Sequence, residues 1–120
     1  MKKIVITGVS TGIGYSSAKI LSESGYFVYG SVRNQNDADK LNRELGDNFK
    51  ALIFDVTNLE SIQNSVEIVK SNLKSNECLS GLINNAGIAL GGPITLIDTE
   101  IFRKQFDVNF FGLIDVTKAF

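Results

Sequence analysis

The stretch that decides the fold is "TGVSTGIG", Thr7 to Gly14, which lies between an apolar run and an amphipathic segment. The apolar run "KIVIT" before it predicts a buried strand, and the segment from Gly14 to Ser24 predicts a helix. Glycines at such a junction let the backbone turn sharply and approach a ligand closely, while free N–H groups and the helix dipole favour an anion. The loop therefore predicts a pyrophosphate site. The alternative is a glycine-rich turn without a ligand, which the position between strand and helix disfavours.

The rest of the chain repeats this alternation of short apolar runs and longer amphipathic stretches. Runs rich in Ile, Val and Phe without polar alternation are typical of strands buried on both faces of a parallel sheet. We therefore expect an α/β fold with strand order 3-2-1-4, in which the fourth strand is a bare hydrophobic edge. The expected elements are, in order, the strand "KIVIT", a helix over 14–24, the strand "YFVYGS", a polar segment over 35–45, the strand "ALIFDV", a helix over 58–74, the strand "LSGLIN" and a last helix.

Helical periodicity predicts which helix faces pack on the sheet. The helix over 58–74 has an apolar residue every three or four positions, which gives one packed stripe of Leu59, Ile62, Val66, Val69 and Leu73. In the first helix we expect the packed face to hold Ile13, Ser17, Ile20 and Leu21, and the solvent face to hold Tyr15, Lys19, Ser22 and Glu23.

Length, composition and charge exclude several classes of protein. The 120 residues are 43% hydrophobic, which suits one small domain, and a net charge of −1 leaves no basic excess for nucleic acid or an anionic membrane. No apolar run approaches the roughly 20 residues that cross a bilayer, and no signal peptide is evident, so we expect a cytoplasmic protein. The single Cys78 and the absence of histidine leave too few ligands for a metal site.

The end of the second strand, "YFVYGSVRN", indicates which dinucleotide is preferred. In dinucleotide sites an acidic residue there binds the adenosine ribose, and an arginine nearby accepts the extra phosphate of NADP. Val32 occupies the acidic position and Arg33 follows it, so no carboxylate repels the 2′-phosphate and a guanidinium can bind it. This favours NADP over NAD, and the alternative is that Arg33 is a solvated surface residue.

Three further signals follow at strand ends and on the last helix: "FDV" with Asp55, "NNAG" over 84–87 and "NFFG" over 109–112. With "TGVSTGIG" as the opening TG-x-x-x-G-x-G motif, the whole chain resembles the short-chain dehydrogenase/reductase family in its ordinary, non-extended form. The resemblance implies a three-layer Rossmann fold and reversible hydride transfer between NAD(P)(H) and an alcohol or carbonyl, a small-molecule substrate.

The resemblance also implies which residues contact the cofactor. Arg33 has the place where NADP-preferring members often carry a basic residue. Asp55 and Val56 would meet the adenine, and Asn85, Ala86 and Gly87 would line the adenosine and ribose. The residues that would wrap the cofactor phosphates are Gly8, Ser10, Thr11, Gly12, Ile13 and Gly14.

Two asparagines receive separate interpretations. Asn84 is expected to be structural, because an amide at a strand end can tie adjacent backbone groups together. Asn109 matches the asparagine that in this family anchors a water in the proton relay, which makes it the catalytic candidate; a satisfied amide that bends the helix is the alternative. Its predicted neighbours on one apolar stripe are Phe102, Phe106, Phe110, Leu113 and Val116.

The family's catalytic serine, tyrosine and lysine follow the next strand, and the sequence stops at "DVTKAF" in the preceding helix. Tyr15 and Lys19 in "YSSAK" have the Tyr-x-x-x-Lys spacing, but we expect them on the solvent face of the first helix and not at the active site. Residues 1–120 are thus expected to be an NAD(P)-binding Rossmann domain, truncated before the catalytic region. A non-catalytic nucleotide-binding or interaction module is the alternative, and Val32 with Arg33 argues against a methyltransferase.

The last helix has a wider apolar arc than one sheet contact requires, including Ile101, Phe106, Phe110 and Leu113. Large exposed apolar surfaces predict a partner, and in this family the same helix commonly takes part in subunit association. We therefore expect a homo-oligomer formed through the last helix.

Overall fold

A four-stranded parallel sheet forms the centre of the protein, and the computed structural model describes all of residues 1–120. The strand order is β3-β2-β1-β4, as predicted, and Ile4 of β1 pairs with Val28 of β2 on one side and Gly81 of β4 on the other. The fold class is therefore confirmed. The strands are β1 (Lys3–Ile6), β2 (Phe27–Val32), β3 (Phe49–Ile53) and β4 (Gly81–Ile83).

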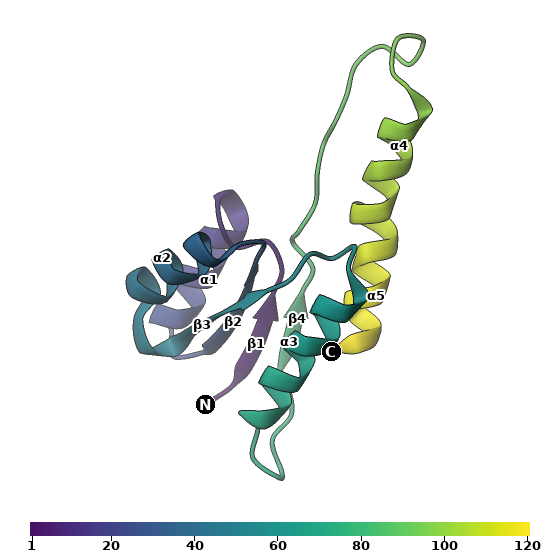
Figure 1. Cartoon of the computed structure of the whole chain (residues 1–120). Helices are drawn as coiled ribbons and strands as arrows, with labels where there is room; N and C mark the ends of the chain where they lie inside the picture. Colours follow the sequence, from purple (N-terminus) through teal and green to yellow (C-terminus); the bar gives the residue numbers. More distant parts are fainter.

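Helices cover both faces of the sheet, which gives the predicted three layers (Figure 1). One face carries α1 (Gly12–Glu23) and α2 (Gln35–Leu45), and the other carries α3 (Leu59–Ser71) and α5 (Leu113–Ala119). A 3-10 turn, η1, precedes β3. After β4 a long segment rises to a tip and returns through α4, so the part of the chain between β4 and α5 extends beyond the sheet (Figure 1). The remaining elements are η1 (Gly46–Asn48), α4 (Thr99–Phe106) and the π-helical turn η2 (Asp107–Gly112).

Two apolar clusters, one on each face, form the core. Ile4 and Ile6 of β1 point to the α1–α2 side, and Val5 between them points to the α3–α5 side. Successive strand residues face opposite sides, so a central strand without polar alternation is buried twice. Burial of each such side chain stabilises the fold by about 1.5–3 kcal/mol.

The packed face of α1 differs from the predicted one. Ile13 and Ile20 are 79% and 62% exposed, whereas Gly14, Ala18 and Ser22 are buried. A Cβ atom on Gly14 would overlap the Gly8 carbonyl and the Asn85 side chain, so the helix needs small residues where it meets the loop and the sheet. Close approach, rather than hydrophobicity, selects this face.

Because a different face of α1 packs on the sheet, Tyr15 and Lys19 of "YSSAK" also have surroundings that differ from the predicted ones. Tyr15, expected in solvent, is half-buried against the α1–α2 cluster, and Ser22, also expected in solvent, is buried. Lys19 and Glu23 are exposed, as predicted. Tyr15 and Lys19 therefore do not share one solvent face.

The helix after β3 is shorter than predicted, because α3 ends at Ser71 instead of continuing to Lys74. Its first apolar residue, Leu59, is 59% exposed. The Asn58 side chain begins the helix by accepting from the Ser61 N–H at 2.9 Å. The buried positions are Ile62, Ser65, Val66 and Val69.

The last helix is interrupted by the π-helical turn η2, which shifts the phase of its apolar stripe. Of the predicted stripe only Val116 is buried, and Gly112 is the other buried residue of this region. Phe106 and Phe110 are 60% and 51% exposed. Most of the stripe is therefore exposed, which agrees with the expected exposure of a wide apolar arc.

Candidate functional site

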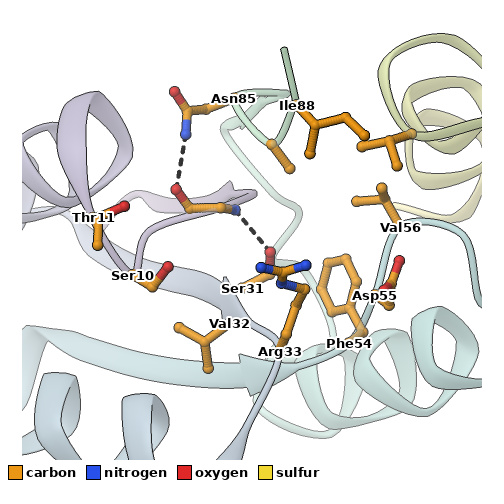
Figure 2. A pocket seen from close by; sticks show the side chains of 14 residues that line it. Ser10, Thr11, Ser31, Val32, Arg33, Phe54, Asp55, Val56, Asn85 and Ile88 are labelled. Atoms are coloured by element: carbon orange, nitrogen blue, oxygen red, sulfur yellow. Dashed lines mark hydrogen bonds between the residues drawn. The ribbon is translucent and has the colours of Figure 1, made fainter. Parts of the chain in front are cut away.

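A cavity lies where the carboxyl ends of all four strands meet, which is the usual ligand position in an open parallel sheet (Figure 2). Its volume is about 270 Å³, near the lower end of the range of roughly 300–1,000 Å³ for small-molecule sites. Both polar and apolar side chains line it. They are Gly8, Ser10, Thr11, Ser31, Val32, Arg33, Phe54, Asp55, Val56, Asn85, Ala86, Gly87, Ile88 and Val108.

The loop between β1 and α1 forms one wall and requires glycine at its start. Gly8 has φ +70°, and a Cβ atom there would lie 2.8 Å from the Ala86 Cα atom. Its N–H donates to the Ser31 hydroxyl at 2.9 Å, as Figure 2 shows. This N–H is therefore engaged, whereas the sequence predicted that it would be free to bind an anion. Thr11, at the start of α1, makes no side-chain capping bond, and the first turn holds no acidic residue. The helix start thus keeps donors for an anion.

Thr7 and Asn85 lock the glycine loop to the segment after β4. The Thr7 hydroxyl accepts from the N–H groups of Asn85 and Ala86 at 3.0 and 2.9 Å. In return, the Asn85 side-chain amide donates to the carbonyls of Thr7 and Gly8 at 3.1 and 2.9 Å. Four bonds between residues about 78 positions apart hold two walls of the cavity together.

The expected backbone tie of Asn84 is made by its neighbour Asn85 instead. The Asn84 amide donates to the Thr117 hydroxyl at 2.9 Å, which joins the end of β4 to α5. The side-chain oxygen of Asn84, Oδ1, is buried without a hydrogen-bond partner. Asn84 is therefore a structural contact, but between two side chains and not between backbone groups.

At the end of β2, Val32 and Arg33 have opposite surroundings. Val32 is buried in the α1–α2 cluster, whereas Arg33 is exposed and its guanidinium lies at the cavity (Figure 2). The position that would carry an acidic residue is thus apolar, and a cation follows it. Arg33 makes no ion pair with another residue, so its donors are available to a ligand.

Asp55, at the end of β3, is held in one orientation by Thr57. The Asp55 Oδ1 atom accepts from the Thr57 hydroxyl at 2.7 Å and from the Thr57 N–H at 2.8 Å. These bonds, and more weakly the positive charge of Arg33, lower the pKa of the Asp55 carboxyl, although partial burial opposes this. Asp55 is therefore a carboxylate at neutral pH, with its Oδ2 atom free to accept a hydrogen bond.

Asn109, in η2, has both side-chain amide atoms engaged. Its oxygen accepts from the Ile88 N–H at 2.8 Å, and its nitrogen donates to the Ile88 carbonyl at 2.7 Å. A Cβ atom on Gly87 would lie 3.2 Å from the Asn109 oxygen, so the segment passes close to the helix. The satisfied amide in an irregular helix matches the structural alternative for this residue, and it does not line the cavity.

A family model with the description short chain dehydrogenase matches residues 2–120. The chain belongs to this family. It corresponds to the N-terminal part of such proteins and spans 36–41% of the length of its curated relatives. No helix is long and apolar enough to cross a membrane, and no group of metal-ligating side chains is present.

Similar members of the short-chain dehydrogenase family include two curated proteins and a solved structure. An NADPH-dependent 3-dehydrocapnine reductase of Ornithobacterium rhinotracheale is 36% identical over 98% of this chain and 41% of that protein. The mitochondrial D-beta-hydroxybutyrate dehydrogenase of Rattus norvegicus is 33% identical over 99% of this chain and 36% of that protein. A closed form of serine dehydrogenase complexed with NADP+ has a TM-score of 0.81 at 30% identity, and the match covers 98% of this chain and 46% of that one.

Most of the site residues expected for a short-chain dehydrogenase come together at the cavity, and a few do not. Gly12, Ile13 and Gly14 belong to the start of α1 and lie outside the cavity lining, as does Asn109. Tyr15 and Lys19 are also outside it. The lining residues among the expected set are Gly8, Ser10, Thr11, Arg33, Asp55, Val56, Asn85, Ala86 and Gly87.

Sequence reasoning missed four lining residues: Ser31, Phe54, Ile88 and Val108. Each stands within two positions of a residue that was identified. Ser31, Phe54 and Ile88 lie near strand ends, where neighbouring residues meet the same cavity edge, and Val108 adjoins Asn109 in η2, so extending the motif positions by one or two residues would have included all four.

Proposed function

We propose that the protein is an NADP-preferring oxidoreductase that transfers hydride between the nicotinamide cofactor and a carbonyl or secondary alcohol. Residues 1–120 supply its NAD(P)-binding Rossmann domain, and the proposal assigns no proton donor within them. One observation carries the cofactor preference: Arg33 stands at the cavity with free donors, and the acidic position beside it is the buried Val32.

The cavity walls fit a nucleotide because glycine and small side chains give the backbone close access. Gly8 cannot carry a side chain against Ala86, and Ser10 and Thr11 place hydroxyl groups beside the start of α1. Asp55, kept ionised and oriented by Thr57, can accept from the exocyclic amino group of an adenine. When bound, the nicotinamide supplies or accepts the hydride.

Two relatives support the choice of NADP. The 3-dehydrocapnine reductase is named as NADPH-dependent, and the serine dehydrogenase structure is described as complexed with NADP+. The names of other relatives, such as the D-beta-hydroxybutyrate dehydrogenase, state no cofactor. The proposal for this chain therefore rests on Arg33, with the relatives as support.

For Asn109 we keep the family's place beside the proton relay as a proposal. Its amide is engaged with Ile88, so a water would be held by the second lone pair of its side-chain oxygen or by its backbone carbonyl. The contact with Ile88 also fixes the residue, since both amide atoms are bound to one backbone unit.

We also propose self-association through α4 and η2. Phe106, Phe110 and Phe111 are 51–60% exposed and lie on one irregular helical stretch. An apolar surface of this kind favours association by the burial of aromatic area. Light scattering on the full chain should show a dimer or larger species that Phe110→Asp weakens, and a monomer at high concentration would contradict the proposal.

The cofactor proposal is tested by calorimetric titration of the full chain with NADP+ and NAD+. We expect Arg33→Ala to weaken NADP+ by about ten- to a hundredfold, since a charge-assisted hydrogen bond contributes about 1.5–3 kcal/mol, and to leave NAD+ nearly unchanged. Arg43→Ala is the matched control, because Arg43 is an exposed arginine in the last turn of α2.

A second pair of probes locates the effect. In the wild type, 2′,5′-ADP should bind more tightly than 5′-AMP, and Arg33→Ala should abolish the difference, because only the 2′-phosphate distinguishes the two nucleotides. An unchanged ratio of NADP+ to NAD+ affinity in Arg33→Ala would overturn the NADP preference.

A further inference from the structure

Two amide side chains on the last helical stretch each bind one backbone unit of the segment after β4. Asn109 binds Ile88, as described above. Gln105, in α4, binds Leu90 in the same way: its oxygen accepts from the Leu90 N–H at 3.0 Å, and its nitrogen donates to the Leu90 carbonyl at 2.6 Å. No residue from 86 to 92 makes a backbone–backbone hydrogen bond, so these two amides replace a neighbouring strand.

The spacing explains why both pairs can form at once. In an extended segment the N–H and carbonyl of every second residue point to the same edge, so residues 88 and 90 present equivalent bonding units about 6.6 Å apart. Gln105, near the end of α4, and Asn109, in η2, are four positions apart, which is about one helical turn and a rise of roughly 5–6 Å. The two repeats nearly match, and a side-chain amide has one donor and one acceptor side by side, as a backbone unit does.

The different lengths of the two side chains fit the path of the segment. Gln105 has one methylene more than Asn109, and it binds Leu90, which lies further along the segment toward the tip than Ile88. Beyond Leu90 come Gly91 and Gly92, and residues 91–96 are all exposed. The clamped part of the segment thus ends at Leu90.

We propose that Gln105 is a positioning residue: through Leu90 it fixes the segment Ile88–Leu90 and thereby the Ile88 wall of the cofactor cavity. Ile88 lines the cavity. Gln105 does not line it, and its hydrogen-bond partner, Leu90, does not line it either. The effect on cofactor affinity rests on the proposed function. The effect on the Leu90 backbone is independent of it.

The first test measures amide hydrogen exchange by NMR in the full chain without cofactor. In Gln105→Leu, which removes the donor and the acceptor, the Leu90 N–H should exchange at least about tenfold faster, while the Val5 N–H in β1 reports that the fold is intact. Gln63→Leu is the control, because Gln63 is an exposed glutamine on α3. Equal Leu90 exchange in the two variants would overturn the clamp.

The second test is recovery by protonation in Gln105→Glu. A carboxylate can accept from the Leu90 N–H but cannot donate to the Leu90 carbonyl, whereas a protonated carboxyl does both. Leu90 exchange, compared with Gln63→Glu at the same pH, should be faster near neutral pH and become equal as the pH falls through the carboxyl pKa, which is about 4.3 in an ordinary glutamate. A side chain that acts only by filling space would show no such recovery.

The third test is the affinity for NADP+. Gln105→Leu should weaken NADP+ binding by up to about tenfold relative to Gln63→Leu. Faster Leu90 exchange with unchanged affinity would overturn the positioning role. If the wild type itself does not bind NADP+, the proposed function fails, and Leu90 exchange with its recovery at low pH alone decides whether Gln105 holds the segment.

Discussion

Different interactions stabilise residues 1–71, the first region, and residues 72–120, the second region. Every buried residue lies in the first region except Gly112 and Val116. The second region is joined to the first by the pairing of β4 with β1 and by Asn85, which binds the glycine loop, and three further amide side chains bind backbone or hydroxyl groups within the second region: Asn84, Gln105 and Asn109. Apolar burial therefore sets the fold, and polar contacts of defined geometry set the position of the segment that completes the site.

The difference has a thermodynamic consequence. Truncation of a fully buried aliphatic side chain lowers the free energy of unfolding by several kcal/mol. A hydrogen bond that replaces bonds to water adds only about 0.5–1.5 kcal/mol to it. The part of the second region outside β4 should therefore open locally more readily than the sheet. A wall of a binding site that must admit a ligand is expected in a region that opens readily.

Truncation of a core residue should give the largest effect and shows how strongly the first region depends on burial. Ile62 is fully buried on α3, and Ile62→Ala should lower the free energy of unfolding by about 2–5 kcal/mol. Ile94→Ala makes the same chemical change at a residue that is 78% exposed and should cost less than about 0.5 kcal/mol. Denaturant unfolding measures both, and similar losses would remove the distinction between the regions.

Removal of the Thr7 hydroxyl should give the next largest effect, because it breaks the lock between the regions. In Thr7→Val the N–H groups of Asn85 and Ala86 lose their shared acceptor at a buried site, which should cost about 1–3 kcal/mol. Thr95→Val is the exposed control. Chemical denaturation gives the stability, and NMR shifts of Asn85 and Ala86 should report the lost bonds; unchanged shifts would show that the lock does not depend on Thr7.

The fold was predictable because the first region displays its burial in the sequence. The runs that form β1 and β2 are apolar without alternation, so the parallel sheet followed from them, and the expected order is the one usual for this type of fold. The packed face of α1 was not predictable from hydrophobicity. Gly14, Ala18 and Ser22 are chosen because they are small, and a helical wheel gives weight only to apolar residues.

The site was predictable where a motif ends a strand, as at Gly8, Arg33 and Asp55. It was not predictable in the second region. The bonds of Gln105 to Leu90 join residues 15 positions apart and leave no periodic pattern, and η2 changes the helical phase within the predicted apolar stripe. Contacts between one side chain and a distant backbone unit become visible only in three dimensions.

Gly112→Ala should have a smaller effect and tests a place where the last helix packs tightly on the first region. A Cβ atom on Gly112 would lie 2.7 Å from the Val56 Cγ2 atom and 2.9 Å from its carbonyl oxygen. Overpacking costs about 1–3 kcal/mol, which the better helix propensity of alanine offsets by about 1 kcal/mol. Gly91→Ala, with no atom near the added Cβ, is the control. Equal unfolding midpoints would indicate that the helix shifts freely, contrary to a fixed contact.

The smallest effect is expected at Glu77, where a charged contact ties the second region to the start of β1. Its carboxylate accepts from the Lys3 ammonium at 2.7 Å and from the Lys74 N–H at 3.0 Å, and these bonds, that of Lys3 first, lower the pKa of Glu77 from 4.5 to about 2. The folded state therefore holds its proton less tightly than the unfolded state. The stabilisation is complete above about pH 4.5 and is lost as the pH falls toward 2.

The matched variant Glu77→Gln keeps the size of the side chain but does not titrate. Unfolding by urea between pH 2 and pH 6 should show a weaker pH dependence in Glu77→Gln than in the wild type, with the difference confined to the range below about pH 4.5. The effect should be small, because both side chains keep contact with solvent, at 15% and 31% exposure, and solvent screens such an ion pair. Parallel pH profiles would show that the contact between Lys3 and Glu77 does not stabilise the attachment of this end of the second region to β1.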